Sequence, residues 1–228
     1  MNCQRDQAES SEHTGRDRVS ALQREIRLLV LLHSAQSAGL VPIGVRQLHV
    51  LVYLSNVLAP VWELPPLDGK VLKLRGGPYY PTLQHDLDRL VARGMVLVSH
   101  LGYTRDEQGH WRLEGAFRLN RLFAEGPIRQ YEQYEQERRL SMFIDELAYA
   151  LAALSDKDLA TAAPEDATYG DEVTSYGNVI DFGEWQSVNY SARAADYFQC
   201  LLPGGASPTR GERLHLYARH LRRRLHGG

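Results

Sequence analysis

The sequence predicts a mainly α protein with a small β-sheet, in which an N-terminal winged helix-turn-helix domain is followed by an all-helical C-terminal domain. The first observation behind this prediction is the stretch 75–98, which has the pattern of a turn, a short helix, a glycine stop and a strand. The second is a strand of alternating apolar and polar residues that returns after a polar turn. The third is a change to helical spacing beyond residue 126.

Length and composition limit the class of protein. A chain of 228 residues fits two small domains, and 43% hydrophobic with 24% charged residues is typical of a globular protein with a buried core. We expect a disordered tail over 1–16, the winged-helix domain over 17–125 and the helical domain over 126–228. No apolar run approaches the roughly 18 residues that span a bilayer, and the polar start lacks the apolar segment of a signal peptide. We therefore expect a cytoplasmic protein with no membrane contact.

The helices of the first domain are predicted from apolar residues at helical spacing. One is expected over residues 18–37 and another over 45–58, where Pro60 ends it. Residues 70–75 are expected to form the short strand that many winged helices place before their third helix. That third helix begins at Pro81, a favoured first-turn residue because its missing N–H would have no partner there.

The third helix is expected to end at Gly94, because glycine readily adopts the left-handed conformation of a helix stop. A strand over 95–101 follows, and a second strand over 111–119 returns beside it. The alternation of this returning strand is the clearest strand signal in the chain. Helix, helix, strand, helix, strand, strand is the order of a winged helix.

The second domain is expected to open with one long helix of about 27 residues after Pro127. Ser155 and Asp158 have the spacing of a capping box that opens a shorter helix, which Pro164 ends. Residues 165–190 are acidic and aromatic and have no regular pattern. An irregular stretch of this length in a compact domain predicts a functional loop.

Two further helices are expected after the acidic aromatic loop, over 191–202 and from Thr209 to near the C-terminus. Thr209 and Glu212 again have capping-box spacing. From Arg210 onward there are six arginines and one acidic residue, whereas 164–187 contains six acidic residues and neither lysine nor arginine. Opposite blocks of this kind can pair with each other or with partners.

No motif of a nucleotide-binding or catalytic site is present in the sequence. The chain lacks a phosphate-binding glycine loop, a dinucleotide-binding glycine pattern and a nucleophile elbow. Asp181-Phe-Gly183 spells the magnesium-binding tripeptide of protein kinases, but without the other kinase motifs we interpret it as chance. His85, Asp86 and Asp88 are the densest group of possible metal ligands, yet neighbouring positions on a helix point apart. We expect no enzyme activity, no cofactor and no metal site.

The candidate contact residues of the winged-helix domain lie on the third helix and its flanks. A DNA-binding face normally gathers positive charge, because phosphate contacts dominate affinity. Asp86 and Asp88 oppose that charge, so the same residues are equally well interpreted as an ordinary solvated face. The residues predicted to touch nucleic acid or a protein partner are Arg75, Tyr79, Tyr80, Gln84, His85, Arg89, Arg93, Arg105 and Arg112.

The candidate partner contacts of the C-terminal domain are aromatic residues with an acidic rim and a basic helix end. Aromatic residues with a polar rim are typical of an interface, although the same aromatics could instead cover the core of their own domain. The arginines either contact phosphate or an acidic protein surface, or satisfy the carbonyls of their own helix end. The residues are Tyr169, Tyr176, Asp181, Phe182, Trp185, Arg219, Arg222, Arg223 and Arg224.

The stretch Gly77-Pro-Tyr-Tyr-Pro-Thr-Leu-Gln-His-Asp-Leu-Asp-Arg-Leu-Val-Ala-Arg-Gly-Met-Val96 resembles the winged-helix core of bacterial middle components. These are accessory subunits of ABC-type, SMC-like three-component conflict systems, of which Lamassu-type defence is an example. The resemblance covers the middle third of the chain and carries no functional residues across. It implies a non-enzymatic adaptor that bridges an SMC-like ATPase and an effector.

The alternative function is a winged-helix transcriptional regulator that binds DNA and forms a homodimer through its helical C-terminal half. The net charge of −2 and the two carboxylates of the third helix favour protein contacts over operator DNA. Protein partners are therefore the first expectation, and DNA contact is the second.

Overall fold

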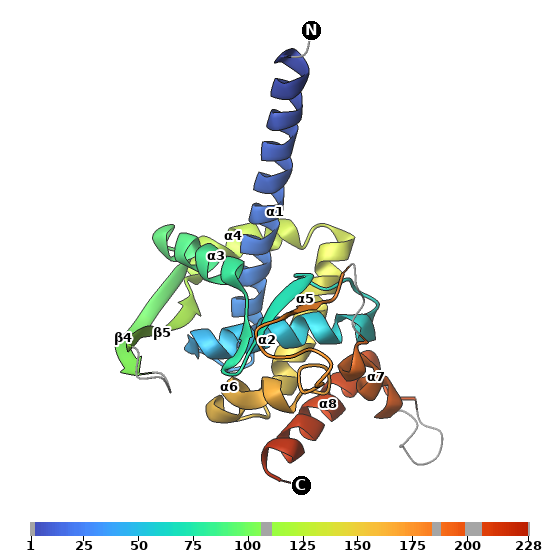
Figure 1. Cartoon of the computed structure of the whole chain (residues 1–228). Helices are drawn as coiled ribbons and strands as arrows, with labels where there is room; N and C mark the ends of the chain where they lie inside the picture. Colours follow the sequence, from blue (N-terminus) through green and yellow to red (C-terminus); the bar gives the residue numbers. More distant parts are fainter. Residues whose placement is uncertain (1–2, 106–110, 184–187, 199–206, 228) are drawn as a thin grey trace.

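The computed structural model describes residues 3–105, 111–183, 188–198 and 207–227, and of 3–19, Thr104 and 111–113 it describes the backbone alone. Within these ranges the chain is mainly helical with two small sheets, as predicted (Figure 1). No helix in the described ranges has the length and apolar character that crossing a bilayer requires. The elements in chain order are α1 Cys3–Ser37, β1 Ile43–Gly44, α2 Val45–Leu58, the 3-10 helix η1 Ala59–Trp62, β2 Lys70–Leu74, β3 Gly77–Tyr79, α3 Pro81–Ala92, β4 Val96–Arg105, β5 Trp111–Leu119, α4 Arg121–Tyr131, α5 Glu135–Leu151, α6 Asp156–Glu165, β6 Val179–Asp181, α7 Tyr190–Tyr197 and α8 Arg210–Leu225.

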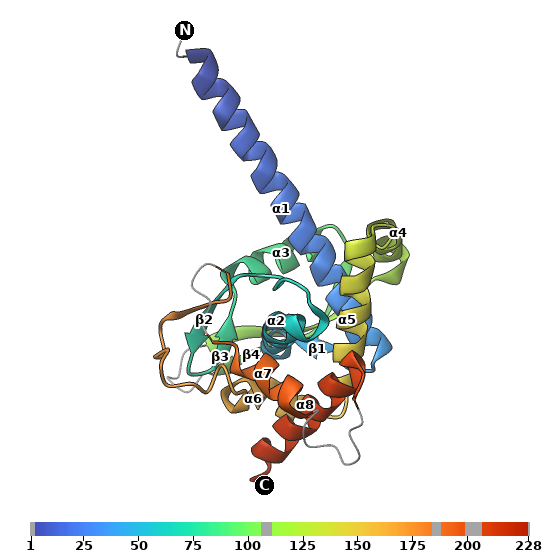
Figure 2. The same cartoon turned by 90° about the vertical axis from the view of Figure 1, so that its right-hand side faces the viewer.

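Helix α1 is longer than the sequence predicted. It begins at Cys3, so the backbone of 3–16, where we expected a disordered tail, continues the helix. Figures 1 and 2 show this N-terminal half projecting away from the body of the molecule. The C-terminal half is fixed in the core through five consecutive buried residues, Leu28 to Leu32. Extending a helix that is already formed requires no new nucleus, which accounts for the extra turns.

The first sheet has the strand order β1-β5-β4 and is antiparallel throughout. Its third strand is β1, where Ile43 pairs with Phe117 and Gly44 with Ala116. A strand was expected over 70–75 before the third helix, and residues 70–74 do form one, but it is not part of this sheet. Strand β1 has two residues, which is too short for an alternating pattern to reveal.

Residues 70–74 instead form the centre of a second antiparallel sheet with the order β3-β2-β6. Leu72 of β2 pairs with Tyr79 on one side and with Val179 on the other. Strand β6 comes from the acidic aromatic loop, for which the sequence predicted no regular structure. Its three residues acquire strand conformation by pairing with β2, which lies about a hundred residues earlier in the chain.

The single long helix expected after Pro127 is divided into α4 and α5. Pro127 lies inside α4, and a turn over 132–134 separates the two helices. The turn allows Glu137, near the start of α5, to accept a hydrogen bond from the hydroxyl of Tyr131, near the end of α4. Arg27 of α1 donates a second hydrogen bond to the Tyr131 oxygen at 3.2 Å. These contacts with α1 explain why one continuous helix does not form.

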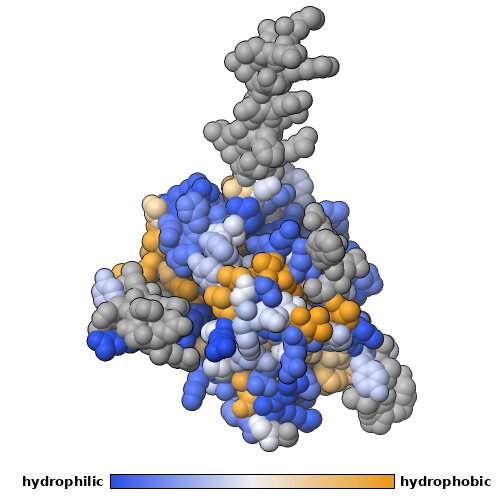
Figure 3. All heavy atoms as spheres, in the orientation of Figure 1, coloured by the Kyte–Doolittle hydropathy of each residue, from blue (hydrophilic) through white to orange (hydrophobic). Residues whose placement is uncertain are grey.

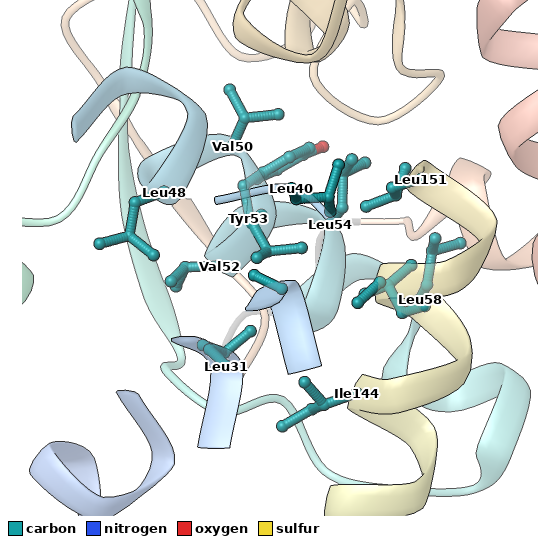
Figure 4. Packing of buried hydrophobic residues seen from close by; sticks show 14 of the residues in the cluster. Leu31, Leu40, Leu48, Val50, Val52, Tyr53, Leu54, Leu58, Ile144 and Leu151 are labelled. Atoms are coloured by element: carbon teal, nitrogen blue, oxygen red, sulfur yellow. The ribbon is translucent and has the colours of Figure 1, made fainter. Parts of the chain in front are cut away.

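Buried side chains from both predicted domains form one hydrophobic cluster. Figure 4 shows Leu31 of α1, Leu54 of α2 and Ile144 of α5 in the same interior. Residues of α8 also belong to this cluster, among them Tyr217, which is fully buried. The predicted boundary at residue 125 therefore does not coincide with a division of the core.

A buried polar group, the carboxyl group of Asp166, joins four segments of this core. The hydroxyl of Tyr53 on α2 donates to its Oδ1 at 2.5 Å, and the hydroxyl of Tyr217 on α8 donates to its Oδ2 at 2.5 Å. Ser191 Oγ on α7 donates to Oδ1 at 2.8 Å. The backbone amides of Thr168 and Tyr169 donate to the same oxygen at 3.0 Å. Five donors thus converge on one side chain that is almost fully shielded from water.

The burial of these tyrosines changes their acidity. Desolvation, followed by the nearby charge of Asp166, raises the pKa of Tyr53 well above its ordinary value of 10.0. The same two causes raise the pKa of Tyr217. Both hydroxyls therefore keep their protons and remain donors across the physiological pH range.

We predict that Asp166→Asn lowers the free energy of unfolding by about 2–4 kcal/mol, because an amide nitrogen cannot accept the hydrogen bonds that one carboxyl oxygen accepts. Urea denaturation followed by circular dichroism measures the change. Glu172→Gln, on an exposed residue of the same acidic stretch, is the matched control and should remain within about 0.5 kcal/mol of the parent. Equal stabilities of the two variants would contradict the central role of Asp166.

Candidate interaction surfaces

The outward face of α3 carries fewer free charges than the sequence implied. His85, Asp88 and Arg89 are exposed and Gln84 is half-buried, as expected for a helix that packs its apolar stripe inward. Gln84 Nε2 donates to Asp88 Oδ1 at 2.9 Å across one helical turn. Both side chains are therefore already partnered on their own helix.

Asp86 does not lie on the outward face. It is 2% exposed, and its Oδ2 accepts a hydrogen bond from Arg24 Nε of α1 at 3.0 Å. Its Oδ1 has no hydrogen-bond partner among the described residues and borders a cavity of about 40 Å³ between α1, α2 and α3. Of the two carboxylates expected to oppose DNA on this helix, Asp88 alone faces outward.

Two arginines of the candidate surface are held by a buried carboxylate. Glu25 of α1 is 3% exposed and forms ion pairs with Arg89 at 3.4 Å and with Arg93. The two arginine side chains remain about half exposed, at 43% and 52%. Because a buried carboxylate needs a positive partner, these arginines stabilise the contact between α1 and α3.

The remaining arginines predicted as contacts in the N-terminal half are not on α3. Arg75 is exposed on the turn between β2 and β3, in the second sheet. Arg105 is exposed at the end of β4, in the first sheet. The side chain of Arg112 lies outside the described residues. The two described arginines, Arg75 and Arg105, thus belong to different sheets.

The two neighbouring tyrosines of the candidate surface have different environments. Tyr79 is 38% exposed, and its ring lies 5.3 Å from that of His49. Tyr80 was predicted as a contact residue, but it is a core residue with 1% exposure. Asn56 Nδ2 donates to its hydroxyl at 2.8 Å, and its backbone N–H donates to His49 Nδ1 at 3.2 Å. The alternation of strand β3 turns Tyr79 outward and Tyr80 inward.

The second sheet presents an apolar face to solvent, which we call the outer sheet face and define as Leu72, Leu74, Tyr79 and Val179. Residues directly opposite on neighbouring strands lie on the same face of a sheet. Tyr79, Leu72 and Val179 are opposite one another in the register, and Leu74 is two positions along the same strand. Val179 is 51% exposed and Leu74 is 37% exposed. Figure 3 shows hydrophobic surface at the centre of this side of the molecule, over the region of the second sheet.

The outer sheet face was not predicted from the sequence. The only local signal is the alternation of β2, where Val71 and Lys73 point inward and Leu72 and Leu74 point outward. Because both sets contain apolar residues, the alternation alone does not say which side faces the core. The buried lysine is the unexpected member of the inward set.

Lys73 links the acidic aromatic loop to the second sheet through a hydrogen bond and ring contacts. Its Nζ donates to the carbonyl oxygen of Asp171 at 2.7 Å and lies 5.2 Å from the ring centre of Tyr176. It also lies 5.5 Å from the ring centre of Tyr169. Cation–π contacts of a desolvated ammonium are favourable, so they offset part of the cost of burying this charge. Tyr176 remains half-exposed beside the sheet.

The other predicted contacts in the loop mostly fold inward. Tyr169 is fully buried and donates to the carbonyl oxygen of Leu74 at 2.6 Å, so it is not available to a partner. Asp181 is buried, pairs with Lys70 at 3.5 Å and accepts a hydrogen bond from the N–H of Gly183. Phe182 packs against the core beside Tyr53. Trp185 lies outside the described residues.

The arginines near the C-terminus divide into two groups. Arg224 pairs with Glu165 of α6 at 3.3 Å, which joins the basic block to the acidic block. Arg219, Arg222 and Arg223 are exposed and line a surface hollow together with His226. The structure thus brings these three predicted residues together on the last turns of α8.

Among the described residues, no group of three or more histidine, cysteine, aspartate or glutamate side chains is arranged to hold a metal ion. No family model matches the chain, and no curated protein and no solved structure matches it either.

We predict that acidification destabilises the fold through His49. Burial lowers the pKa of His49 from its ordinary 6.5 to about 4, so the neutral ring contributes stability that is fully present above pH 6.5 and is lost as the pH falls towards about 4. Protonation of Nδ1 would also remove the acceptor for the Tyr80 N–H. The measurement is the urea midpoint as a function of pH.

His49→Asn is the matched variant, because its amide oxygen can accept the same hydrogen bond without titrating. It should show a shallower loss of stability than the parent between pH 6.5 and about 4. Parallel pH profiles of the two proteins would contradict the assignment to His49.

Proposed function

We propose that this chain is a non-enzymatic adaptor subunit that binds protein partners through the outer sheet face. The single observation that carries the proposal is the row of apolar side chains exposed across β3, β2 and β6. Apolar and aromatic side chains in a contiguous exposed patch are typical of a protein interaction site. Polar and charged groups border the row, including the pair formed by Lys70 and Asp181.

The capture of arginines by Glu25 supports protein contacts over DNA contacts on α3. A phosphate group would have to compete with a buried carboxylate for Arg89 and Arg93. Breaking that pair would leave Glu25 buried without a positive partner, which is costly. The resemblance of residues 77–96 to middle components suggests an SMC-like ATPase and an effector as the partners, in a bacterial defence complex.

The strand order supports the winged-helix assignment of the N-terminal half. The order α1, β1, α2, α3, β4, β5 with a sheet β1-β5-β4 is that of a winged helix, and β2 and β3 form an insertion before α3. In this assignment the β4–β5 hairpin is the wing. It carries the exposed residues Leu101 and Tyr103, which are better suited to a protein than to a phosphate backbone.

We predict that Leu74→Glu combined with Val179→Glu abolishes co-purification of the chain with the products of its neighbouring genes, because two buried charges without partners would be placed in the interface. Tyr197→Glu, on an exposed residue of α7, is the control and should retain the partners. Circular dichroism verifies that each variant is folded. Retention of every partner by the double variant would refute the proposal.

The second candidate is a winged-helix regulator of transcription that acts as a homodimer. The inward position of Asp86 favours it, because one negative charge is then absent from the outward face of α3. In that case the chain would bind a palindromic site near its own gene tightly and selectively. Arg89→Ala should then abolish the gel shift on that site. The shift of a random duplex should be the same for the parent and the variant. If the chain is an adaptor, neither the parent nor the Arg89→Ala variant should shift the palindromic site selectively.

A further inference from the structure

The last turns of α8 carry three arginines on one side, which we call the arginine face and define as Arg219, Arg222 and Arg223. Residues three and four apart on a helix are neighbours on its surface. The opposite side of α8 packs into the core through Leu214, Tyr217, Ala218 and Leu221. The three guanidinium groups are therefore directed to solvent together, and with His226 they line a surface hollow.

The charge of the arginine face is not neutralised by the described part of the chain. The nearby acidic residues of α6 are already engaged, since Glu165 pairs with Arg224 at 3.3 Å and Asp158 with His226 at 3.2 Å. Among the described residues, no carboxylate lies within ion-pair distance of the three arginines. Three permanent positive charges are thus held close together without a counter-charge.

The arginine side chains are not needed to cap their own helix. The backbone N–H of His226 donates to the carbonyl oxygens of Arg222 at 3.3 Å and Arg223 at 3.2 Å. The N–H of Gly227 donates to the carbonyl oxygen of Arg224 at 3.3 Å. The sequence left open that the arginines hydrogen-bond to the last carbonyl groups of their own helix, but backbone N–H groups already do so. The guanidinium groups remain available to a ligand.

We propose that the arginine face binds the phosphodiester backbone of nucleic acid. A guanidinium group matches the geometry of a phosphate and can donate two parallel hydrogen bonds to it. An acidic protein fits less well, because protein interfaces have an apolar or aromatic centre. Of the described residues, Arg219, Arg222, Arg223 and His226 line the hollow, and α8 has no large apolar side chain that is exposed.

A second copy of this chain is a poor source of the missing negative charge. In the acidic aromatic loop, Glu165 and Asp181 are paired within the molecule and Asp166 is buried. Asp171 uses one carboxyl oxygen to accept the N–H of Val173 in its own turn. Of the described carboxylates in this loop, Asp171 and Glu172 alone are neither ion-paired nor buried, so a second copy would offer two negative charges to three arginines.

The position of the arginine face separates it from α3. Figures 1 and 2 show α3 in the upper part of the body and the C-terminal end of α8 at the opposite, lower end. A short cluster of arginines without an element that enters a groove contacts phosphates and does not identify bases. The binding is consequently independent of sequence, and it is distinct from both functions proposed above for the outer sheet face and for α3.

The test measures the affinity of the full chain for a fluorescent DNA duplex of arbitrary sequence, across a salt series. We expect the parent to bind, with log K falling steeply as log salt rises. Arg219→Gln, Arg222→Gln and Arg223→Gln together should weaken binding at least tenfold. The salt slope should fall by about 0.9 for each phosphate contact removed.

Two controls make the test specific. Arg224→Gln changes the same charge on the same helical turn as Arg223→Gln, but Arg224 is paired with Glu165, so it should have the smaller effect. Arg89→Gln with Arg93→Gln should leave this non-selective binding unchanged. Equal losses from Arg223→Gln and Arg224→Gln would refute the proposal, because they would reflect net charge alone.

Three further outcomes would overturn the proposal: absence of binding by the parent, binding that is lost with the α3 arginines, and binding to polyglutamate or to phosphatidylserine vesicles without binding to DNA. Circular dichroism verifies that the triple variant is folded. Co-purification with the products of neighbouring genes should be unaffected by the triple variant, so failure of the adaptor proposal and failure of this one are distinguishable.

Discussion

The carboxyl group of Asp166 is the point on which the arrangement of the C-terminal half depends. It receives hydrogen bonds from α2, α7, α8 and the backbone of its own loop, so four segments can dock only in one relative position. Apolar packing alone tolerates several arrangements of similar volume, whereas a buried acceptor with five donors specifies one. The same loop is then held to β2 by the hydrogen bonds of Tyr169 to Leu74 and of Lys73 to Asp171, and it continues to β6, which completes the second sheet.

The arginines of this molecule differ in whether a carboxylate pairs with them. Glu25 and Asp86 are buried and hold arginines of α1 and α3, so the basic residues of α3 serve the packing of two helices. The acidic residues of α6 pair with Arg224 and His226, and not with Arg219, Arg222 or Arg223 of α8. A formal net charge near zero is therefore compatible with a locally positive surface at one end of the body.

The helices could be predicted from the sequence because their signals are local. The bounds Val45–Leu58 of α2 follow from apolar spacing and from Pro60, and the capping boxes at Ser155 and Thr209 are present as predicted. Gly94 has the positive φ expected of a helix stop after α3. In each case the residues that determine the structure lie within a few positions of one another.

The candidate surfaces were less predictable because their determinants are distant in the chain. Asp166 is one acidic residue in an acidic stretch, and its donors come from positions as far apart as Tyr53 and Tyr217. Helical spacing places Asp86 on the inner stripe with Leu83 and Leu90, but a buried carboxylate there depends on Arg24 of another helix, which no local pattern encodes. Strand β6 and the outer sheet face exist because Val179 pairs with Leu72, which no local pattern encodes.

The outer sheet face has one further consequence, because two parts of the chain that are separated by about a hundred residues build it jointly. A ligand that touches Val179 and Tyr79 at once can be held tightly only while β6 remains hydrogen-bonded to β2. Its binding free energy is then added to that of docking the acidic aromatic loop, and each event strengthens the other by the same factor. Ligand binding at the outer sheet face would in this way favour the docked loop, and with it the contacts of Asp166 with α8, without any change in the shape of the core.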